Sequence, residues 1–160
     1  MRVLITGAAG MIGSKLAARL RTDGVLAGRA IGSLILQDIV APLGAAAADL
    51  VRLGDLGAMA AELITLRPDV VFHLAGVVSG EAEADFALGY RVNLDGTRAL
   101  FDAIRVADYL PRVVYASTTA VFGGPFPEVI GDDFAPVPLS SYGAQKLMGE
   151  TLLVDYTRRG

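Results

Sequence analysis

This chain of 160 residues contains no cysteine and a single histidine, His73. Without cysteine it can form no disulfide and offers no thiolate ligand, and one imidazole would leave a zinc site dependent on carboxylates. We therefore expect no metal site. The lack of cysteine also favours a reducing compartment, so a cytoplasmic location is the default expectation.

Long hydrophobic runs and an excess of one charge are also missing. The 14 basic and 17 acidic residues are mixed along the chain, and no basic run suggests nucleic acid or an acidic membrane surface as a partner. The longest stretch without a charged residue, 113–127, is shorter than a membrane span and contains glycines and prolines. With 53% hydrophobic residues, the chain can instead bury the core of one ordinary domain.

Short apolar runs alternate with segments of helical periodicity. The expected strands are 2–6, 33–39, 48–53, 69–76 and 112–117. The expected helices are 11–24, 56–67, 82–107 with a break near Gly89, and 141–159, while the proline- and glycine-rich segment 123–140 is expected to be an extended loop. Continuously apolar strands separated by helices predict an α/β fold with a doubly wound parallel sheet.

The segment TGAAGMIG joins the first expected strand to the first expected helix. Gly7 can make the tight turn, Gly10 lets backbone amides approach a pyrophosphate, and Gly13 lets the helix pack closely on the strand. The helix N-terminus at Met11 and Ile12 then offers unpaired N–H groups to phosphates. A tight turn without a ligand is the alternative, but the strand–loop–helix context predicts a dinucleotide site.

An acidic residue, Asp38, ends the second expected strand. A carboxylate at this place can accept hydrogen bonds from the ribose hydroxyls of adenosine and would repel a 2′-phosphate. No arginine follows it directly, so NAD is favoured over NADP. The alternative is a solvated aspartate at the end of a strand.

The stretch SYGAQK places Tyr142 and Lys146 four positions apart, on one face of the expected last helix. An ammonium about 4 Å from a phenol would favour the phenolate by roughly 4 kcal/mol at an effective dielectric of 20. Before desolvation is subtracted, this amounts to about three pKa units. By itself the pair could equally be two amphipathic side chains on the flank of a helix.

These features, in their order and spacing, resemble the extended short-chain dehydrogenase/reductase family, also called the NAD-dependent epimerase/dehydratase family. The matching segments run nearly end to end and are TGAAGMIG, Asp38, GDL (54–56), HLAG (73–76), VNLDGT (92–97), ASTTAVFG (116–123) and SYGAQK (141–146). The resemblance implies a Rossmann-type NAD-binding domain over residues 1–160. It also implies that relatives continue with a smaller substrate domain, so this chain alone is not expected to have full activity.

The resemblance assigns roles by position. Thr118, Tyr142 and Lys146 would be catalytic: Tyr142 as the base, Thr118 orienting the same substrate oxygen, and Lys146 lowering the pKa of Tyr142 and holding the ribose. Ser117 is a less suitable hydroxyl, and His73 is expected to be a packed residue at a strand end. The set expected to contact NAD is Gly7, Gly10, Met11, Ile12, Gly13, Asp38, Asp55, Leu56, Leu74, Ala75, Gly76, Asn93, Tyr142 and Lys146.

Segments 75–100 and 121–134 show a closer resemblance to the D-erythronate dehydrogenases, which oxidise the 2-hydroxyl of a four-carbon sugar acid with NAD. Glu81 and Glu83, in the first of these segments, are expected to be solvated residues at the start of a helix. A nucleotide-sugar epimerase or dehydratase is the alternative within the family, and a non-catalytic NAD-binding module is the alternative outside enzymology. In relatives the long helix and the last helix pair across a dimer, so a homodimer is expected.

Overall fold

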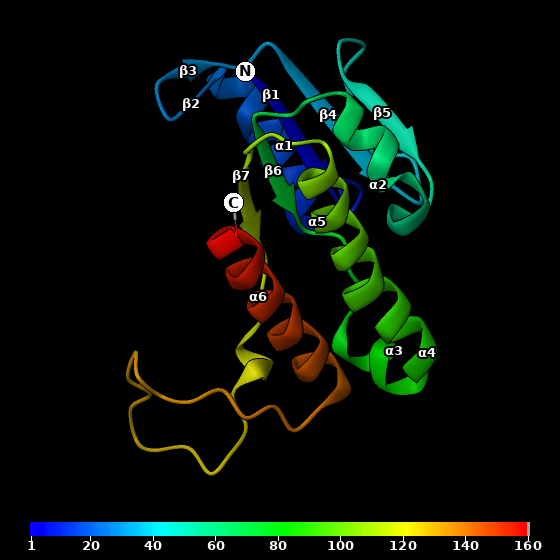
Figure 1. Ribbon diagram of the computed structural model, residues 1–160. Helices are drawn as coiled ribbons and strands as arrows, with labels where there is room; N and C mark the ends of the chain where they lie inside the picture. Colours follow the sequence, from blue (N-terminus) through cyan, green and yellow to red (C-terminus); the bar gives the residue numbers. More distant parts are fainter. Residues whose placement is uncertain (160) are drawn as a thin grey trace.

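A computed structural model describes residues 1–159 and contains one five-stranded parallel sheet (Figure 1). Its order is β5-β4-β1-β6-β7, so the chain crosses from β1 outward in both directions. The strands are β1 (Arg2–Thr6), β4 (Ser33–Asp38), β5 (Leu50–Leu53), β6 (Val70–His73) and β7 (Arg112–Tyr115). The predicted doubly wound fold is confirmed.

Helices cover the two faces of this sheet. The helices are α1 (Met11–Asp23), α2 (Leu56–Thr65), α3 (Ser79–Ala84), α4 (Phe86–Gly89), α5 (Gly96–Val106) and α6 (Ser141–Arg159). Side chains alternate along β1, so Val3 and Ile5 pack with α1 whereas Leu4 packs with α2 and α5. Partly buried residues of α6 join the second of these clusters, which places α6 on the same face as α5.

Two local elements differ from the sequence-based expectation. Residues 25–30 form a small antiparallel hairpin, β2 (Val25–Leu26) and β3 (Arg29–Ala30), outside the main sheet. The expected long helix begins earlier, at Ser79, and is broken at Asp85 in addition to the expected break near Gly89, where α4 ends. The Asp85 side chain caps α4 by accepting a hydrogen bond from the Leu88 amide at 2.9 Å.

Between α4 and α5 the chain forms a π-helix, η1 (Tyr90–Asp95). Its wider turn is closed by a hydrogen bond from the Gly96 amide to the Arg91 carbonyl, five residues earlier. A π-turn inserts one residue into a helix and occurs frequently at functional sites. Here the inserted turn carries Asn93, which is buried.

After β7 the chain makes a short 3₁₀ turn, η2 (Thr119–Val121), and then a long loop. Figure 1 shows this yellow-to-orange loop extending away from the rest of the molecule before it returns to α6. The extended loop predicted for 123–140 is confirmed. Within residues 1–159, no helix is both long and apolar enough to cross a membrane.

Candidate dinucleotide-binding and active site

The glycine loop between β1 and α1 lies directly against the loop that follows β6. Gly7 has a φ of 70°, and a Cβ there would lie 2.6 Å from the backbone nitrogen of Ala75. At Gly13 a Cβ would lie 2.8 Å from the Cα of Ala8. Both positions therefore exclude any side chain. Gly10 caps α1, and no side chain within the described chain caps that helix, which leaves its N-terminus open to an anion.

A cavity of about 410 Å³ opens at the carboxyl ends of β1, β4 and β6. This is the edge where ligands bind in doubly wound sheets. Eight of the residues expected to contact NAD line it, namely Gly7, Gly10, Asp38, Asp55, Leu56, Leu74, Ala75 and Gly76. Long-range folding thus brings together four sequence segments that the motifs had linked only by resemblance.

Asp38 ties the second strand to the glycine loop. Its Oδ2 accepts a hydrogen bond from the Ala9 amide at 2.8 Å, and its Oδ1 accepts one from the Ile39 amide at 2.7 Å. The carboxylate remains half-buried and lines the cavity. It therefore shapes the loop and places a negative charge at the cavity wall.

Three further polar residues line the cavity. Asp55 caps α2 by accepting a hydrogen bond from the Ala58 amide at 3.1 Å. Gln37, which the sequence did not single out, donates from Nε2 to the Gly54 carbonyl at 2.7 Å and joins the ends of β4 and β5. Glu81 is exposed in the first turn of α3, as expected of a solvated residue at the start of a helix, and it also lines the cavity.

Beneath the cavity, a buried chain of hydrogen bonds passes through His73. The Thr97 hydroxyl donates to the Asn93 carbonyl at 2.7 Å, so it must accept the hydrogen bond from His73 Nε2 at 2.8 Å. The unprotonated Nδ1 then accepts from the Thr6 hydroxyl at 2.8 Å, which in turn accepts from the Ala75 amide at 3.3 Å. Burial, with a smaller contribution from Lys146, lowers the pKa of His73 to about 3. The prediction that His73 is a packed residue is confirmed.

Asn93 continues this network from η1 to α6. Its side-chain amide accepts from the Val77 amide at 2.9 Å and donates to the Val77 carbonyl at 3.1 Å. The same Nδ2 donates to Oε1 of Gln145 at 2.8 Å. Gln145, which lies between Tyr142 and Lys146 in the sequence, is fully buried. The network thus connects the loop along the cavity to α6, the helix that carries Tyr142 and Lys146.

Thr118 caps the 3₁₀ turn η2 at the carboxyl end of β7. Its Oγ1 accepts from the Ala120 amide at 3.2 Å, which leaves the hydroxyl hydrogen available to a ligand. This turn packs against the start of α6, because a Cβ at Gly143 would lie 3.0 Å from the Cβ of Pro138 and would collide with the Ala120 carbonyl. Thr118 and Tyr142 are therefore carried by two elements in direct contact.

The N-terminus of α6 is capped from α3. The Glu83 carboxylate accepts hydrogen bonds from the Ser141 amide at 2.6 Å and from the Tyr142 amide at 3.4 Å. A negative charge at a helix N-terminus pairs with unbonded amides and with the helix dipole. Glu83 therefore holds the turn that carries Tyr142, a role that the sequence did not indicate.

Lys146 is buried, with 5% of its surface exposed. Its Nζ lies 4.3 Å from the centre of the Tyr115 ring. Burial lowers the pKa of Lys146 to about 8, and the neighbouring Glu150 opposes this change. Burial also raises the pKa of Tyr115, with further contributions from Glu150 and Tyr142. The lysine thus sits in a low-dielectric position facing an aromatic ring.

The remaining expected contacts lie outside the cavity. Met11 and Ile12 are exposed at the start of α1, beside Gly13. Asn93 and Lys146 are buried beyond the cavity wall, and Tyr142 is half-buried at the start of α6. Ser117 donates a hydrogen bond to Glu150 rather than standing with Thr118, which agrees with its lower rank as a reacting group.

A parallel doubly wound sheet with an uncapped glycine loop at its carboxyl edge defines a nucleotide-binding protein of the Rossmann type. Residues 3–160 match the model of the NAD dependent epimerase/dehydratase family. The chain belongs to that family.

Individual relatives carry two kinds of name. The chain is 51% identical to the D-erythronate dehydrogenase of Cupriavidus necator and 39% identical to that of Haemophilus influenzae, covering all of this chain and 52% and 51% of those proteins. A crystal structure described as the nucleoside-diphosphate-sugar epimerase from Agrobacterium tumefaciens is 53% identical, with a TM-score of 0.94 over all of this chain and 49% of that one. The chain thus spans about half the length of the curated relatives it matches.

Proposed function

We propose that this chain is the NAD-binding part of an NAD-dependent dehydrogenase that oxidises the 2-hydroxyl of a four-carbon sugar acid resembling D-erythronate. The gathering of eight expected NAD contacts around one cavity carries this proposal. The two D-erythronate dehydrogenases among its relatives support the sugar-acid substrate.

The residues present fit NAD. The glycine loop would accept the pyrophosphate at the uncapped N-terminus of α1, since Gly7 and Gly13 leave no side chain in the way. Asp38 would accept hydrogen bonds from the adenosine ribose, and Asp55 with Leu56 would contact the adenine. Bound NAD supplies the hydride acceptor that no side chain of this chain can provide.

In the proposed mechanism, Tyr142 and Thr118 act on the substrate hydroxyl. Tyr142, as phenolate, takes the hydroxyl proton while the Thr118 hydroxyl donates a hydrogen bond to the same oxygen and orients it. Lys146, as ammonium, stabilises the phenolate and holds the nicotinamide ribose. Loss of the proton from the hydroxyl oxygen and of a hydride from the carbon that bears it turns the secondary alcohol into a ketone, so the product is a 2-oxo sugar acid.

The test is reduction of NAD by the complete protein, followed at 340 nm with D-erythronate, D-threonate and UDP-glucose. We expect turnover with a four-carbon acid, loss of turnover in Tyr142→Phe, and NAD affinity within about threefold of the parent protein. Near-normal turnover in Tyr142→Phe would remove the tyrosine from the mechanism. Turnover with none of the acids would remove the substrate assignment.

A second candidate is a nucleotide-sugar epimerase, and the name of the structurally similar Agrobacterium tumefaciens protein favours it. An epimerase retains its cofactor through the cycle, whereas a dehydrogenase releases NADH. Protein purified with tightly held cofactor, together with conversion of a UDP-sugar without net NAD reduction, would favour the epimerase. Cofactor binding without either reaction in the complete protein would favour a non-catalytic NAD-binding module.

Pairing of two copies through α5 and α6 is part of the same proposal. Val106 and Val154 are exposed apolar residues on these two helices, 74% and 69% exposed respectively. Light scattering of the complete protein measures the assembly, and a monomer at micromolar concentration would contradict it.

A further inference from the structure

The buried Lys146 ammonium lies over an aromatic ring, that of Tyr115. Its Nζ lies 4.3 Å from the centre of the Tyr115 ring, well inside the range of about 6 Å for a cation–π interaction. Tyr115 is the last residue of β7, so this ring comes from the sheet and not from the helix that carries the lysine. A cation so deeply buried needs partners that compensate for its lost hydration.

The helix is shaped to admit this ring. Gly149, inside α6, would place a Cβ 2.6 Å from Cζ of Tyr115 and in collision with its hydroxyl oxygen. Glycine is unfavourable inside a helix, and any larger residue here would push the ring away from Lys146. Gly149 therefore lets Tyr115 lie against the turn of α6 that carries the lysine.

Other charged and titratable groups around the ammonium come from two elements, α6 and β6. Glu150 of α6 raises the pKa of Lys146 and accepts a hydrogen bond from Ser117, which fixes its carboxylate near β7. His73 of β6 packs against Tyr115, with the two ring centres 5.5 Å apart, and its imidazole stays neutral. Tyr142 of α6 lies close enough to raise the pKa of Tyr115.

We propose that Tyr115 is a positioning residue for the reaction, because the face of its ring holds the Lys146 ammonium in place through a cation–π interaction. The role rests on the proposed function, in which a charged Lys146 is required. Tyr115 acts through its ring face, so its hydroxyl is dispensable and its aromatic character is not. The ring stabilises the charged form, so its loss lowers the pKa of Lys146.

The titration of Lys146 tests this directly. Lys15 and Lys146 are the only lysines in these 160 residues, so ¹³Cε-labelled lysine gives two NMR signals, with Lys15 as the internal reference. In Tyr115→Phe we expect Lys146 to titrate within about 0.3 pH units of the parent protein. In Tyr115→Leu we expect its pKa to fall by about half to one unit. An unchanged or raised pKa in Tyr115→Leu would overturn the proposal.

A second measurement needs no variant and covers the case in which Tyr115→Leu fails to fold. Protons above an aromatic ring are shielded, so the ε-methylene protons of Lys146 should resonate upfield of those of Lys15. Coincident chemical shifts of these protons in the two lysines would overturn the proposal that the Lys146 ammonium lies over the Tyr115 ring. Neither measurement requires cofactor or substrate, so failure of the proposed dehydrogenase activity would leave both results standing.

The consequence for the reaction is a third measurement, made on the complete protein once a substrate is known. Tyr115→Phe should keep the pH dependence of kcat/KM. In Tyr115→Leu the basic limb of the kcat/KM profile should move to lower pH by as much as the pKa of Lys146 falls. A purely structural role for Tyr115 predicts lower activity without that movement. A shift of the basic limb that equals the shift of the Lys146 pKa supports the proposal. A loss of activity with an unchanged basic limb contradicts it.

Discussion

The side-chain amide of Asn93 pairs with both backbone polar groups of Val77, as a neighbouring strand would. The Val77 amide donates to Asn93 Oδ1 at 2.9 Å, and Asn93 Nδ2 donates to the Val77 carbonyl at 3.1 Å. These two bonds hold the loop that lines the cavity, and the third, to Gln145, holds α6. The π-turn at η1 places Asn93 between them.

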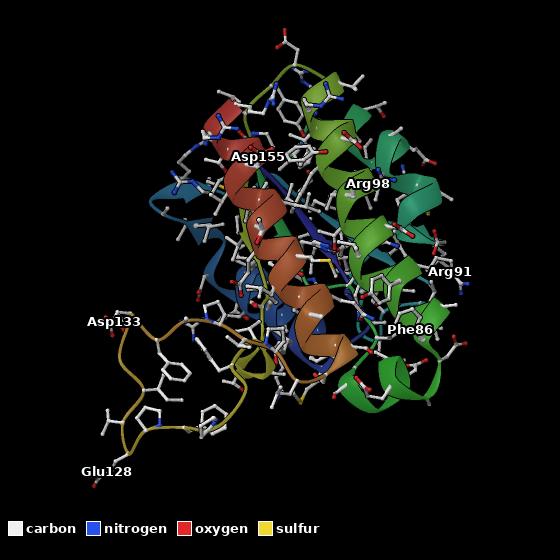
Figure 2. All side chains as sticks on the ribbon, turned by 60° about the horizontal axis from the view of Figure 1, so that its bottom comes forward. Phe86, Arg91, Arg98, Glu128, Asp133 and Asp155 are labelled. Carbon is white, nitrogen blue, oxygen red and sulfur yellow. The ribbon has the colours of Figure 1, made fainter. Side chains whose placement is uncertain are left out.

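Replacing Asn93 by leucine should therefore destabilise the protein by about 3 kcal/mol, because one buried and two partly buried groups lose their partner. Chemical denaturation measures this change. Arg91→Ala, on the same π-helix but exposed, is the matched control and should stay within about 0.5 kcal/mol. Figure 2 shows Arg91 on the outer side of its helix. Equal effects of the two substitutions would show that the Asn93 bonds contribute no stability.

Removal of the Glu83 cap should loosen the start of α6. Glu83→Ala loses the hydrogen bonds to Ser141 and Tyr142, and we expect a loss of about 0.5–1 kcal/mol because Glu83 is exposed. Turnover should fall more than NAD affinity, since the turn bearing Tyr142 frays while the cavity is untouched. Glu128→Ala is the control, because Glu128 points into solvent on the projecting loop (Figure 2). An unchanged kcat in Glu83→Ala would contradict this role.

His73 should make stability depend on pH between about 6.5 and 3. Its pKa is about 3 in the folded protein and about 6.5 in an unfolded chain, so the unfolded chain binds one more proton in this window. Stability from this group is fully present above pH 6.5 and is lost as the pH falls, with a slope of about 1.4 kcal/mol per pH unit. The free energy of unfolding of the parent protein and of His73→Gln, compared between pH 7 and 5, isolates this slope.

A direct check uses the single imidazole of the chain. The Cε1 proton of His73 should not titrate between pH 8 and 5 in the folded protein, since the ring stays neutral there. A midpoint near 6.5 would refute the buried, neutral ring. The hydrogen bonds to Thr6 and Thr97 would then have to be broken in solution.

Asp38 should set the choice between NAD and NADP. Asp38→Asn removes the charge that repels a 2′-phosphate but keeps one oxygen to accept from Ala9 or Ile39. We expect NAD to bind about tenfold more weakly, equivalent to about 1.4 kcal/mol, and the preference for NAD over NADP to fall by at least as much. Calorimetric titration with both nucleotides measures this. Asp133→Asn, on the projecting loop, should change neither the affinity for NAD nor the preference for NAD over NADP (Figure 2).

Much of this site could be anticipated because its signals are local. Gly7 and Gly13 lie close together in the sequence, and the left-handed φ of Gly7 and the packing of Gly13 on Ala8 involve only the glycine loop itself, although Gly7 also packs against the distant Ala75. The five strands were recognisable because continuous apolar runs mark buried parallel strands. The hairpin at 25–30 was missed because its two-residue strands carry no periodicity.

Other features depend on residues far apart in the chain. Glu83 and Ser141 are separated by 58 residues, and Asn93 and Gln145 by 52. The π-turn is likewise invisible in the sequence, because one inserted residue does not disturb the helical pattern enough to be seen. Spacing alone predicted that Tyr142 and Lys146 share a helix face, but not that the ammonium would lie over Tyr115.

The sequence by itself determined the fold class and the glycine loop, which depend on residue types at short spacing, and its resemblance to a family named the candidate reacting groups. Only the tertiary structure decided how those groups are held: which ring faces the lysine, which carboxylate caps the helix, and which amide joins it to the cavity wall. The physical reason is that burial and hydrogen-bond pairing belong to the packed chain. A charge is tuned by whatever the fold brings next to it, wherever that residue lies in the sequence.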